Sequence, residues 1–429
     1  MKLTKEEKSM LVGAEGPVRE KVMNTLFLYG QALGAERFAD IQGCGHFSIP
    51  FCMPGLGPRL EMLQELADAG MRTRFGFTLD PRPPLDFENL FISHEQEDIF
   101  RDLYSDQQTY DNLMLQLGLR DDKAYTCTPY FSEVGNIPAR GEVLAWSESS
   151  CVVYANSVLG ARTNRNAAVM DILSNLIGKT PLTGFLLDEG RQAHWRIEVN
   201  TSTLPNPQLL GAAIGMKVME DVPFITGLER FLDPTLPPDT IDFLKEMGAA
   251  CAAIGAVGLY HIRGVTPEAV EQDEALLRPD YQTYIIDDHL LEDMFDAYPV
   301  TWSDAGAEPQ KCLIGCPHLS LGELHRWTED IARGLKQHGR DRVAVDTVLC
   351  AAPQVIDLFR AEKASYDLLV SFGVRLSPSC PEAYMTNQSC AAEAVVTNSN
   401  KLRAFTPARM FLDRDLVQII ATGQVARGK

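Results

Sequence analysis

Three cysteines stand in loop-like segments that are broken by proline. Cys127 lies in TCTPY, Cys316 in IGCPHLS and Cys380 in SPSCPEAY. Thiolates hold zinc ions and iron–sulfur clusters, and three separate thiolates would leave one iron of a cluster open to a substrate. Their long separations in sequence match no local zinc or ferredoxin pattern, so ordinary buried cysteines are the alternative. A half zinc site made by Cys312, Cys316 and His318 is a second alternative.

Polar residues interrupt an apolar stretch at residues 145–166, AWSESSCVVYANSVLGARTNRN. Glu148, Ser149, Arg162 and Asn164 need partners if they are buried, and a small polar substrate is one such partner. Arginine suits bidentate binding of a carboxylate. A helix end with capping residues and a structural arginine pair is the alternative. Lys401 follows a strand-like run in VVTNSNKLRAFTP, where it can bind a carboxylate or remain solvated.

The elements that must position these residues alternate between helix and strand patterns. Capping boxes at Thr4/Glu7 and Ser320/Glu323 predict helix starts, and Asn166 is predicted to cap a third helix. Strands are predicted over 72–79, 258–262, 343–350 and 368–376, and helices over 60–69, 166–177, 240–254, 320–339 and 354–363. The run from 343 to 376 predicts a βαβ unit with Cys380 just past the carboxyl end of a strand, where ligands bind in such folds.

Composition limits the classes of function. The chain has 429 residues and a formal net charge of −19, which disfavours nucleic acid and anionic membrane surfaces as partners. No apolar run reaches the roughly 20 residues of a membrane-spanning helix, and the N-terminal MKLTKEEKSM lacks an apolar signal segment. We therefore expect a cytoplasmic protein with ten reduced cysteines.

Several long motifs resemble the aconitase X family, specifically its large catalytic subunit. They are TCTPY, GNIPARGEVLAWSESSCVVYANSVLGARTN, YHIRGVTPEA, IGCPHLSLGEL and TNSNK, in the family's order and spread over nearly the whole chain. The resemblance implies an aconitase-like α/β fold of several lobes, with mixed or parallel sheets and the active site between lobes. We place these lobes at 1–125, 126–310 and 311–429. The family's small swivelling domain is expected to be absent from this chain and supplied by a small partner subunit, giving a heterodimer.

The resemblance also implies an activity, an iron–sulfur-dependent hydro-lyase that removes water from a small hydroxy-carboxylate. Members act on cis-3-hydroxy-L-proline or on phosphomevalonate. Carried over by motif, the roles fall on the cluster ligands Cys127, Cys316 and Cys380, the catalytic residues Ser149, Glu148 and Lys401, and the substrate-binding residues Asp80, Pro81, His46, Arg162, Asn164 and Ser399. The cluster nuclearity stays open.

Departures from the family pattern bear on the substrate. Asp80 stands where phosphomevalonate-type members have Asn, and the run 49–51, Ile-Pro-Phe, stands where they have a substrate-contacting Gly-Val-Ser. Asn400 replaces a Gly of the TNSGK motif, and residues 166–167, Asn-Ala, replace Glu-Gly. Because Asp80 repels phosphate and attracts an ammonium group, cis-3-hydroxy-L-proline is the preferred substrate, converted to Δ1-pyrroline-2-carboxylate. A phosphomevalonate dehydratase large subunit is the alternative, and a non-catalytic or zinc-binding paralogue is an alternative of another class.

Overall fold

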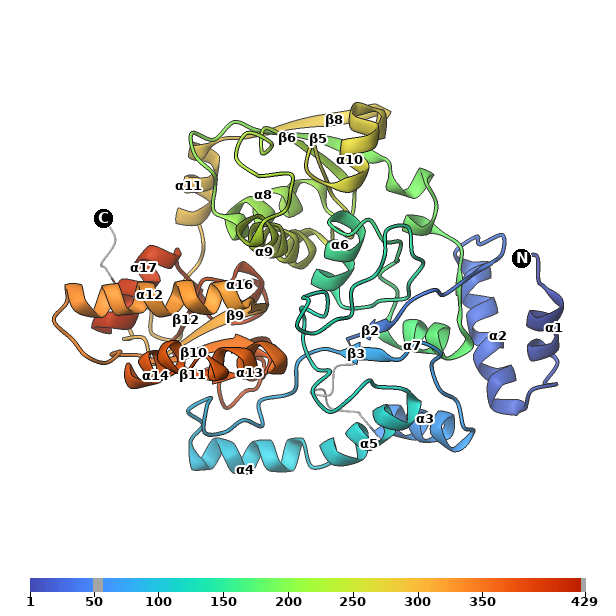
Figure 1. Ribbon diagram of the computed structural model, residues 1–429, viewed down its shortest axis with the longest axis horizontal. Coiled ribbons are helices and arrows are strands. Elements are labelled where there is room, and N and C mark those ends of the chain that lie inside the picture. Colours follow the sequence, from blue (N-terminus) through green and yellow to red (C-terminus); the bar gives the residue numbers. More distant parts are fainter. Residues whose placement is uncertain (49–56, 426–429) are drawn as a thin grey trace.

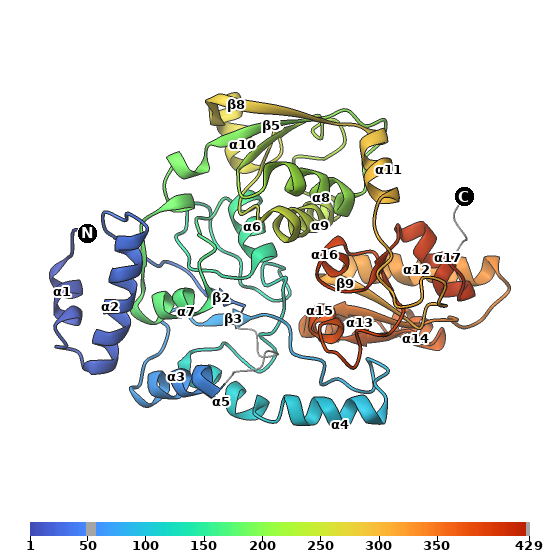
Figure 2. The ribbon, with the colours of Figure 1, turned by 180° about the vertical axis from the view of Figure 1, so that it is seen from behind.

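The computed structural model describes residues 1–48 and 57–425 and has an α/β fold (Figures 1 and 2). The first part of the chain holds α1 (Lys5–Leu11), α2 (Pro17–Ala32), β1 (Phe38–Asp40), β2 (Gly45–Phe47), α3 (Gly57–Asp68), β3 (Phe77–Leu79), α4 (His94–Leu103) and α5 (Gln107–Leu117). The capping box at Thr4 is confirmed. β2 and β3 pair in parallel, His46 against Thr78, and are fully buried.

The central part of the chain contains a four-stranded sheet, at the top of Figure 1. Its elements are α6 (Ser149–Ser157), α7 (Ala168–Ile177), β4 (Lys179–Pro181), the short 3-10 helices η1 (Gly184–Leu186) and η2 (Glu189–Arg191), β5 (Ala193–Val199), α8 (Pro207–Val218), β6 (Pro223–Thr226), α9 (Pro238–Gly255), β7 (His261–Ile262), α10 (Pro267–Gln272), η3 (Asp273–Leu276), β8 (Leu277–Ile286) and α11 (Asp288–Asp296). The strands pair in parallel in the order β7-β6-β5-β8, with α8 and α9 packed on one face of the sheet and α10 packed with residues of the other.

α8 and α9 lie against each other more closely than helices with ordinary side chains can. A Cβ on Gly211 would lie 2.3 Å from the Met247 carbonyl oxygen, and one on Gly255 would lie 2.1 Å from the Gly215 carbonyl oxygen. Glycine at these positions therefore sets the helix spacing, and α9 extends as the small-residue pattern of 240–254 predicts.

The last part of the chain forms a five-stranded parallel sheet in the order β11-β10-β9-β12-β13, at the left of Figure 1. Its elements are β9 (Lys311–Leu319), α12 (Leu321–Gln337), β10 (Asp346–Ala351), α13 (Pro353–Ala361), α14 (Lys363–Ser371), β11 (Arg375–Ser377), α15 (Pro381–Met385), β12 (Val395–Thr397), α16 (Asn400–Phe405), β13 (Arg409–Met410) and α17 (Asp413–Thr422). The Ser320/Glu323 capping box and the parallel pairing of β10 with β11 are confirmed.

Three local expectations are wrong, two of them because a glycine takes a left-handed conformation. The strand predicted over 72–79 is reduced to β3, because Gly76 takes a left-handed φ of 72°. The segment 368–371 continues α14, and the strand begins only after Gly373, at a φ of 90°. Asn166 does not cap α7, since the N-cap is Ala167. Its side chain instead donates to Asp171 Oδ1 at 2.8 Å.

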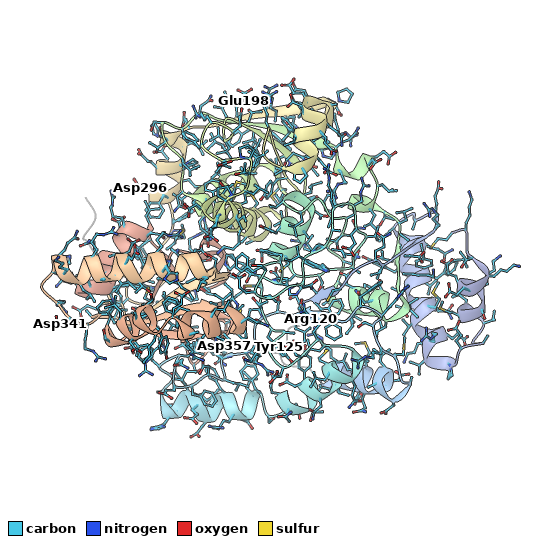
Figure 3. The ribbon with its side chains drawn as sticks, viewed as in Figure 1. Arg120, Tyr125, Glu198, Asp296, Asp341 and Asp357 are labelled. Atoms are coloured by element: carbon cyan, nitrogen blue, oxygen red, sulfur yellow. The ribbon has the colours of Figure 1, made fainter. Side chains whose placement is uncertain are left out.

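β9 lies between two hydrophobic cores and contributes side chains to both. Cys312, Ile314 and Leu319 pack into the core shared with the central sheet, whereas Leu313 and Cys316 pack into the core shared with the first part of the chain. The first and last parts also meet at the surface. There Lys123 pairs with Asp357 at 2.6 Å, beside Tyr125 (Figure 3).

The lobe boundaries at 125/126 and 310/311 stay a prediction. Over residues 1–48 and 57–425, no helix combines the length and apolar character needed to cross a bilayer.

Candidate active site

A buried ion pair joins α6 to α16. Glu148 is the N-cap of α6, and its Oε2 accepts from Ser150 Oγ at 2.6 Å and from the Cys151 amide at 2.7 Å. Its Oε1 accepts from Ser149 Oγ at 3.3 Å and from Lys401 Nζ at 3.0 Å. The side chains of Glu148 and Lys401 are 4% and 14% exposed. Four donors therefore hold the carboxylate, and the pair fixes the start of α6 against α16.

Both members of this pair are charged. Burial alone would raise the pKa of Glu148, but Lys401 and the hydrogen bonds from Ser150 and Cys151 lower it well below its usual range. Burial would lower the pKa of Lys401, whereas Glu148 and Glu382 hold it well above its ordinary value. Lys401 Nζ lies 3.8 Å from the carboxylate of Glu382. The lysine is thus a fixed cation between two carboxylates.

The three predicted cysteines gather beside Lys401, at the carboxyl side of the parallel sheet. The His318 amide donates to Cys127 Sγ at 3.2 Å, which joins the Cys127 loop to the end of β9 where Cys316 lies. Cys380 is the N-cap of α15, and its Sγ accepts from the Ala383 amide at 3.4 Å. Three segments far apart in sequence therefore bring their thiols toward one region.

The electrostatics of the thiols agree with this convergence. Burial raises the pKa of Cys316 to about 12 and that of Cys127 and Cys380 well above their ordinary value. Negative charge on Cys316 adds to the increase at both other thiols, and Cys127 adds to it at Cys380. Lys401 opposes the increase at Cys127 and Cys316. The three sulfurs thus lie close enough to affect one another, and Lys401 acts on two of them, those of Cys127 and Cys316.

His46, in the middle of β2, and Asp80, directly after β3, form a second polar pair. His46 Nε2 lies 3.6 Å from Asp80 Oδ1, and among the described residues neither of these buried atoms has a hydrogen-bond partner. His46 Nδ1 lies 2.9 Å from Thr78 Oγ1, which accepts from Asn136 Nδ2. Burial and the charge of Glu148 raise the pKa of Asp80, and His46 opposes this. The pair faces the Glu148 carboxylate with unused hydrogen-bonding capacity.

Two further predicted residues border the cysteines. Ser399 Oγ donates to the Cys316 carbonyl at 2.5 Å, so it holds the strand end rather than pointing to open space. Pro81 lies between Asp80 and Arg82, and the Arg82 carbonyl accepts from the Cys380 amide at 3.0 Å. The Asp80–Pro81 turn is therefore tied to the Cys380 loop.

The polar contacts of Arg162 and Asn164 lead away from this cluster. Arg162 donates to the Leu186 carbonyl at 3.0 Å and to Asp188 Oδ1 at 2.5 Å. Asn164 donates to the Thr183 carbonyl at 2.9 Å. Both side chains stabilise the segment 183–188, as the alternative of a structural arginine predicts. Their substrate role stays a prediction that these contacts do not support.

Arg165 is the arginine that faces the site, and the sequence interpretation named its neighbour instead. The backbone of Arg165 pairs with Trp146, two residues before Glu148, whereas that of Arg162 pairs with Val143. Burial lowers the pKa of the Arg165 guanidinium, and the charge of Glu148 opposes the decrease. Arg162 is held by Leu186 and Asp188, whereas Arg165 interacts with Glu148. A run such as RTNR does not reveal this difference.

Glu382 is the other residue that sequence reasoning missed. It lies in the first turn of α15, two residues after Cys380, and faces Lys401. Burial raises the pKa of Glu382; Lys401 opposes the increase, while Asp80 and Glu148 add to it. The signal in the sequence was an acidic residue directly after Cys-Pro, at a predicted strand end.

His46, Glu148 and Cys151 place their ligand atoms within 4.8 Å of one another, which a small cation could exploit. Each Glu148 oxygen already accepts two hydrogen bonds, however, and the Cys151 thiol donates to the Cys127 carbonyl at 3.1 Å. This saturation favours an ion-pair role for Glu148.

The alternative zinc site is not favoured by packing. Cys312 and Cys316 belong to different hydrophobic cores, and His318 Nδ1 lies 3.1 Å from Thr126 Oγ1. Burial lowers the pKa of His318 to about 3, so its ring is neutral. The Ile-Pro-Phe departure at 49–51 lies outside the described residues.

Comparison with known proteins defines the class. The model of the aconitase X first domain matches residues 1–189, and that of the second domain matches residues 193–296. The chain belongs to the aconitase X family, and it is a dehydratase, that is, a hydro-lyase.

Relatives and a solved structure support this assignment in detail. The chain is 32% identical to the phosphomevalonate dehydratase large subunit of Thermococcus kodakarensis, over 86% of this chain and 84% of that one. It is 29% identical to the cis-3-hydroxy-L-proline dehydratase of Pseudomonas aeruginosa, over 94% of this chain and 66% of that one. The crystal structure of Thermococcus kodakaraensis aconitase X in its holo-form matches with a TM-score of 0.78 and 28% identity, covering 98% of this chain and 100% of that one. The expected α/β fold of the family is confirmed.

Proposed function

We propose that this chain is the large subunit of an iron–sulfur-dependent dehydratase that removes water from cis-3-hydroxy-L-proline, giving Δ1-pyrroline-2-carboxylate. The observation that carries the proposal is the meeting of three thiols with the Glu148–Lys401 pair in one buried region. A binding protein has no need to keep a buried ion pair against three cysteines.

The donor set fits a cluster with one open iron. Cys127, Cys316 and Cys380 would hold it, and the amides of His318 and Ala383 already donate to two of the sulfurs, as backbone donors to cluster sulfurs do. Lys401 supplies positive charge beside the thiolates. When bound, the cluster supplies Lewis-acid assistance to a leaving hydroxyl group.

The chain's own residues manage the proton and the developing charge. Dehydration removes the α-proton of the substrate carboxylate and expels the β-hydroxyl group as water. Ser149 is the proposed base, and Glu148 orients it through the 3.3 Å hydrogen bond. Lys401 stabilises the negative charge that grows on the substrate carboxylate. His46 and Asp80, with their unpartnered buried atoms, are placed to hold the proton that the leaving hydroxyl group needs.

The balance of charge favours a substrate with a positive group. Three carboxylates, those of Asp80, Glu148 and Glu382, affect one another's protonation. Lys401 acts on Glu148 and Glu382, and Arg165 interacts with Glu148. The ammonium group of an amino acid would relieve this excess, whereas a phosphate would increase it. The enamine formed first from hydroxyproline would tautomerise to the pyrroline product.

The second candidate is a phosphomevalonate dehydratase large subunit. The specific observation in its favour is length, because this chain covers 84% of the first such relative and 96% of the one from Methanocaldococcus jannaschii, but 66% of the hydroxyproline enzyme. Relatives of this length are named large subunits, so we also propose a small partner subunit for this chain.

Iron and sulfide analysis tests the cofactor. The protein, purified without oxygen, is expected to contain both elements and to absorb in the visible range. Cys127→Ser, Cys316→Ser and Cys380→Ser should each lose the absorption and the activity. Cys44→Ser is the matched control, since this partly buried thiol donates to the Gly45 carbonyl at 3.7 Å and has Arg120 and Glu142 as its charged neighbours. Absence of iron and sulfide from the intact protein would refute the cofactor.

A two-substrate assay tests the substrate, with and without the partner subunit. Water loss from cis-3-hydroxy-L-proline and from phosphomevalonate is measured side by side. Asp80→Asn restores the residue of phosphomevalonate-type members, and it should reduce kcat/KM for hydroxyproline by roughly tenfold or more, the value of a hydrogen bond to a charged group. Turnover of phosphomevalonate alone would favour the second candidate.

A further inference from the structure

A buried polar network lies behind the site, on α8 and α9. The side chain of Lys245 is fully buried and that of Glu323 is 2% exposed, and the two form an ion pair. Lys245 Nζ also lies 3.4 Å from Glu246 Oε1 and 3.3 Å from the His318 carbonyl. None of these three charged groups belongs to the proposed chemistry. Burying them is unfavourable unless they are well paired, so their arrangement requires a reason.

The network continues from Glu246 to the start of α16. Gln208 Nε2 donates to Glu246 Oε2, and Gln208 Oε1 accepts from the Asn400 amide at 2.9 Å. Asn400 Nδ2 donates to the Gln208 carbonyl at 3.0 Å and to Tyr298 Oη at 2.8 Å. Gln208 therefore uses both ends of its side-chain amide, and it holds the residue directly before Lys401.

A shorter connection closes this network into a ring. Ser399 Oγ donates to the Cys316 carbonyl, and the strand continues to His318, whose amide donates to Cys127 Sγ and whose carbonyl accepts from Lys245. The ring thus runs from the cysteine-bearing end of β9 through α9 and α8 to α16. α16 has six residues, and these two anchors tie its start to β9 and to α8, in addition to the Lys401–Glu148 pair that ties it to α6.

We propose that Gln208 and Glu246 are positioning residues that set Lys401 relative to the cysteine-bearing end of β9. This inference rests on the proposed role of Lys401 and extends it to residues of the second domain that touch none of the proposed reacting groups. Because the ring passes through α8 and α9, the distance between Lys401 and the thiols depends on how these two helices are spaced. The glycine contacts between the helices fix that spacing.

Reversal of one hydrogen bond tests the proposal. Gln208→Glu places two carboxylates together, and it keeps the acceptor for the Asn400 amide but loses the donor to Glu246. At pH 8, kcat should fall by about tenfold or more with little change in KM, since small misplacements of catalytic groups act on kcat. Glu246→Gln combined with Gln208→Glu restores the pair with donor and acceptor exchanged, and kcat should return to within about threefold of wild type.

The pH profile separates positioning from a loss of stability. Burial raises the pKa of Glu246 to about 7, with Lys245 lowering it and Glu323 and Asp413 adding to the increase. In Gln208→Glu, a proton bound between the two carboxylates at pH 6 restores the bridge, so the deficit in kcat should shrink on acidification. The double variant should show no such trend. Gln108→Glu is the matched control, because Gln108 is exposed and donates to Asn112 Oδ1 at 3.2 Å, on α5.

The outcomes are distinct. If Gln208→Glu folds with an unchanged melting temperature and keeps the kcat of wild type at both pH values, the inference is wrong. The same conclusion follows if the double variant folds but shows no recovery. If instead Lys401→Met retains activity, the proposed function of Lys401 fails first, whatever the Gln208 variants do.

Discussion

The Glu148–Lys401 pair makes a quantitative prediction about stability. Lys401→Met keeps the length of the side chain but removes its charge, and it leaves a carboxylate that is 4% exposed without its cation. Breaking a buried pair from one side costs about 3–5 kcal/mol. Because Ser149, Ser150 and the Cys151 amide still donate to Glu148, we expect the lower end, about 3 kcal/mol. A chain of 429 residues has an unfolding entropy of about 0.9 kcal/mol/K near 60 °C, so the melting temperature should fall by roughly 3 °C.

The pH dependence of this loss identifies its cause. In the native protein the pKa of Glu148 is held below its usual range, so its contribution to stability is present above the unfolded pKa of about 4.3 and is lost as the pH falls below it. In Lys401→Met, burial without a cation raises the folded pKa above that value. The variant should therefore lose stability as the pH rises from about 4.5 toward neutral. The gap in melting temperature between wild type and Lys401→Met should widen over the same range.

Thermal unfolding followed by circular dichroism at pH 4.5, 6 and 7.5 measures this gap. Lys363→Met is the matched control, since its ion pair with Asp367 is largely exposed and should contribute nothing measurable. Lys401→Met with Glu148→Gln removes both charges and should be more stable at pH 7.5 than Lys401→Met alone. The reasoning is refuted if the gap is the same at all three pH values, or if the double variant gains nothing.

Three further outcomes follow from the structure. Gly315→Ala should destabilise the protein by at least about 2 kcal/mol in chemical denaturation, since Gly315 has a φ of 110° and its Cβ would lie 2.2 Å from the Cys350 carbonyl oxygen; an unchanged midpoint would contradict the backbone geometry. Burial lowers the pKa of His261 to about 4, so stability should decrease as the pH falls from about 6.5 to 4. His261→Asn should make that decrease shallower, and an equal slope in both proteins would exclude this histidine as its cause. Ser320→Ala removes the N-cap of α12 and should cost about 1 kcal/mol in the same assay, with Ser320→Thr as the variant that keeps the cap.

Sequence reasoning works best where the signal is local. Capping boxes at Thr4 and Ser320 mark helix starts correctly, because a hydrogen bond between residues three apart depends on nothing distant. Sequence reasoning is weaker where a glycine interrupts a predicted strand, as at Gly76 and Gly373. An alternating apolar pattern does not indicate that a single residue is left-handed.

The candidate site shows the same division. Motifs were enough to indicate Glu148, Lys401 and the cysteines, and the structure brings these together. They could not choose between Arg162 and Arg165, since the choice depends on distant partners, Leu186 and Asp188 for Arg162 and Glu148 for Arg165. Nor could they find Gln208, whose significance arises only from contact with a residue far along the chain.

The position of β9 between two apolar cores has a consequence for how the molecule unfolds. A strand whose alternate side chains belong to both cores transmits the loss of either one to the other. The two cores are therefore coupled through β9. Calorimetry should record them melting as one cooperative unit rather than in sequence. A destabilising substitution in either core, far from the thiols, would then unfold the catalytic centre as completely as a substitution beside them.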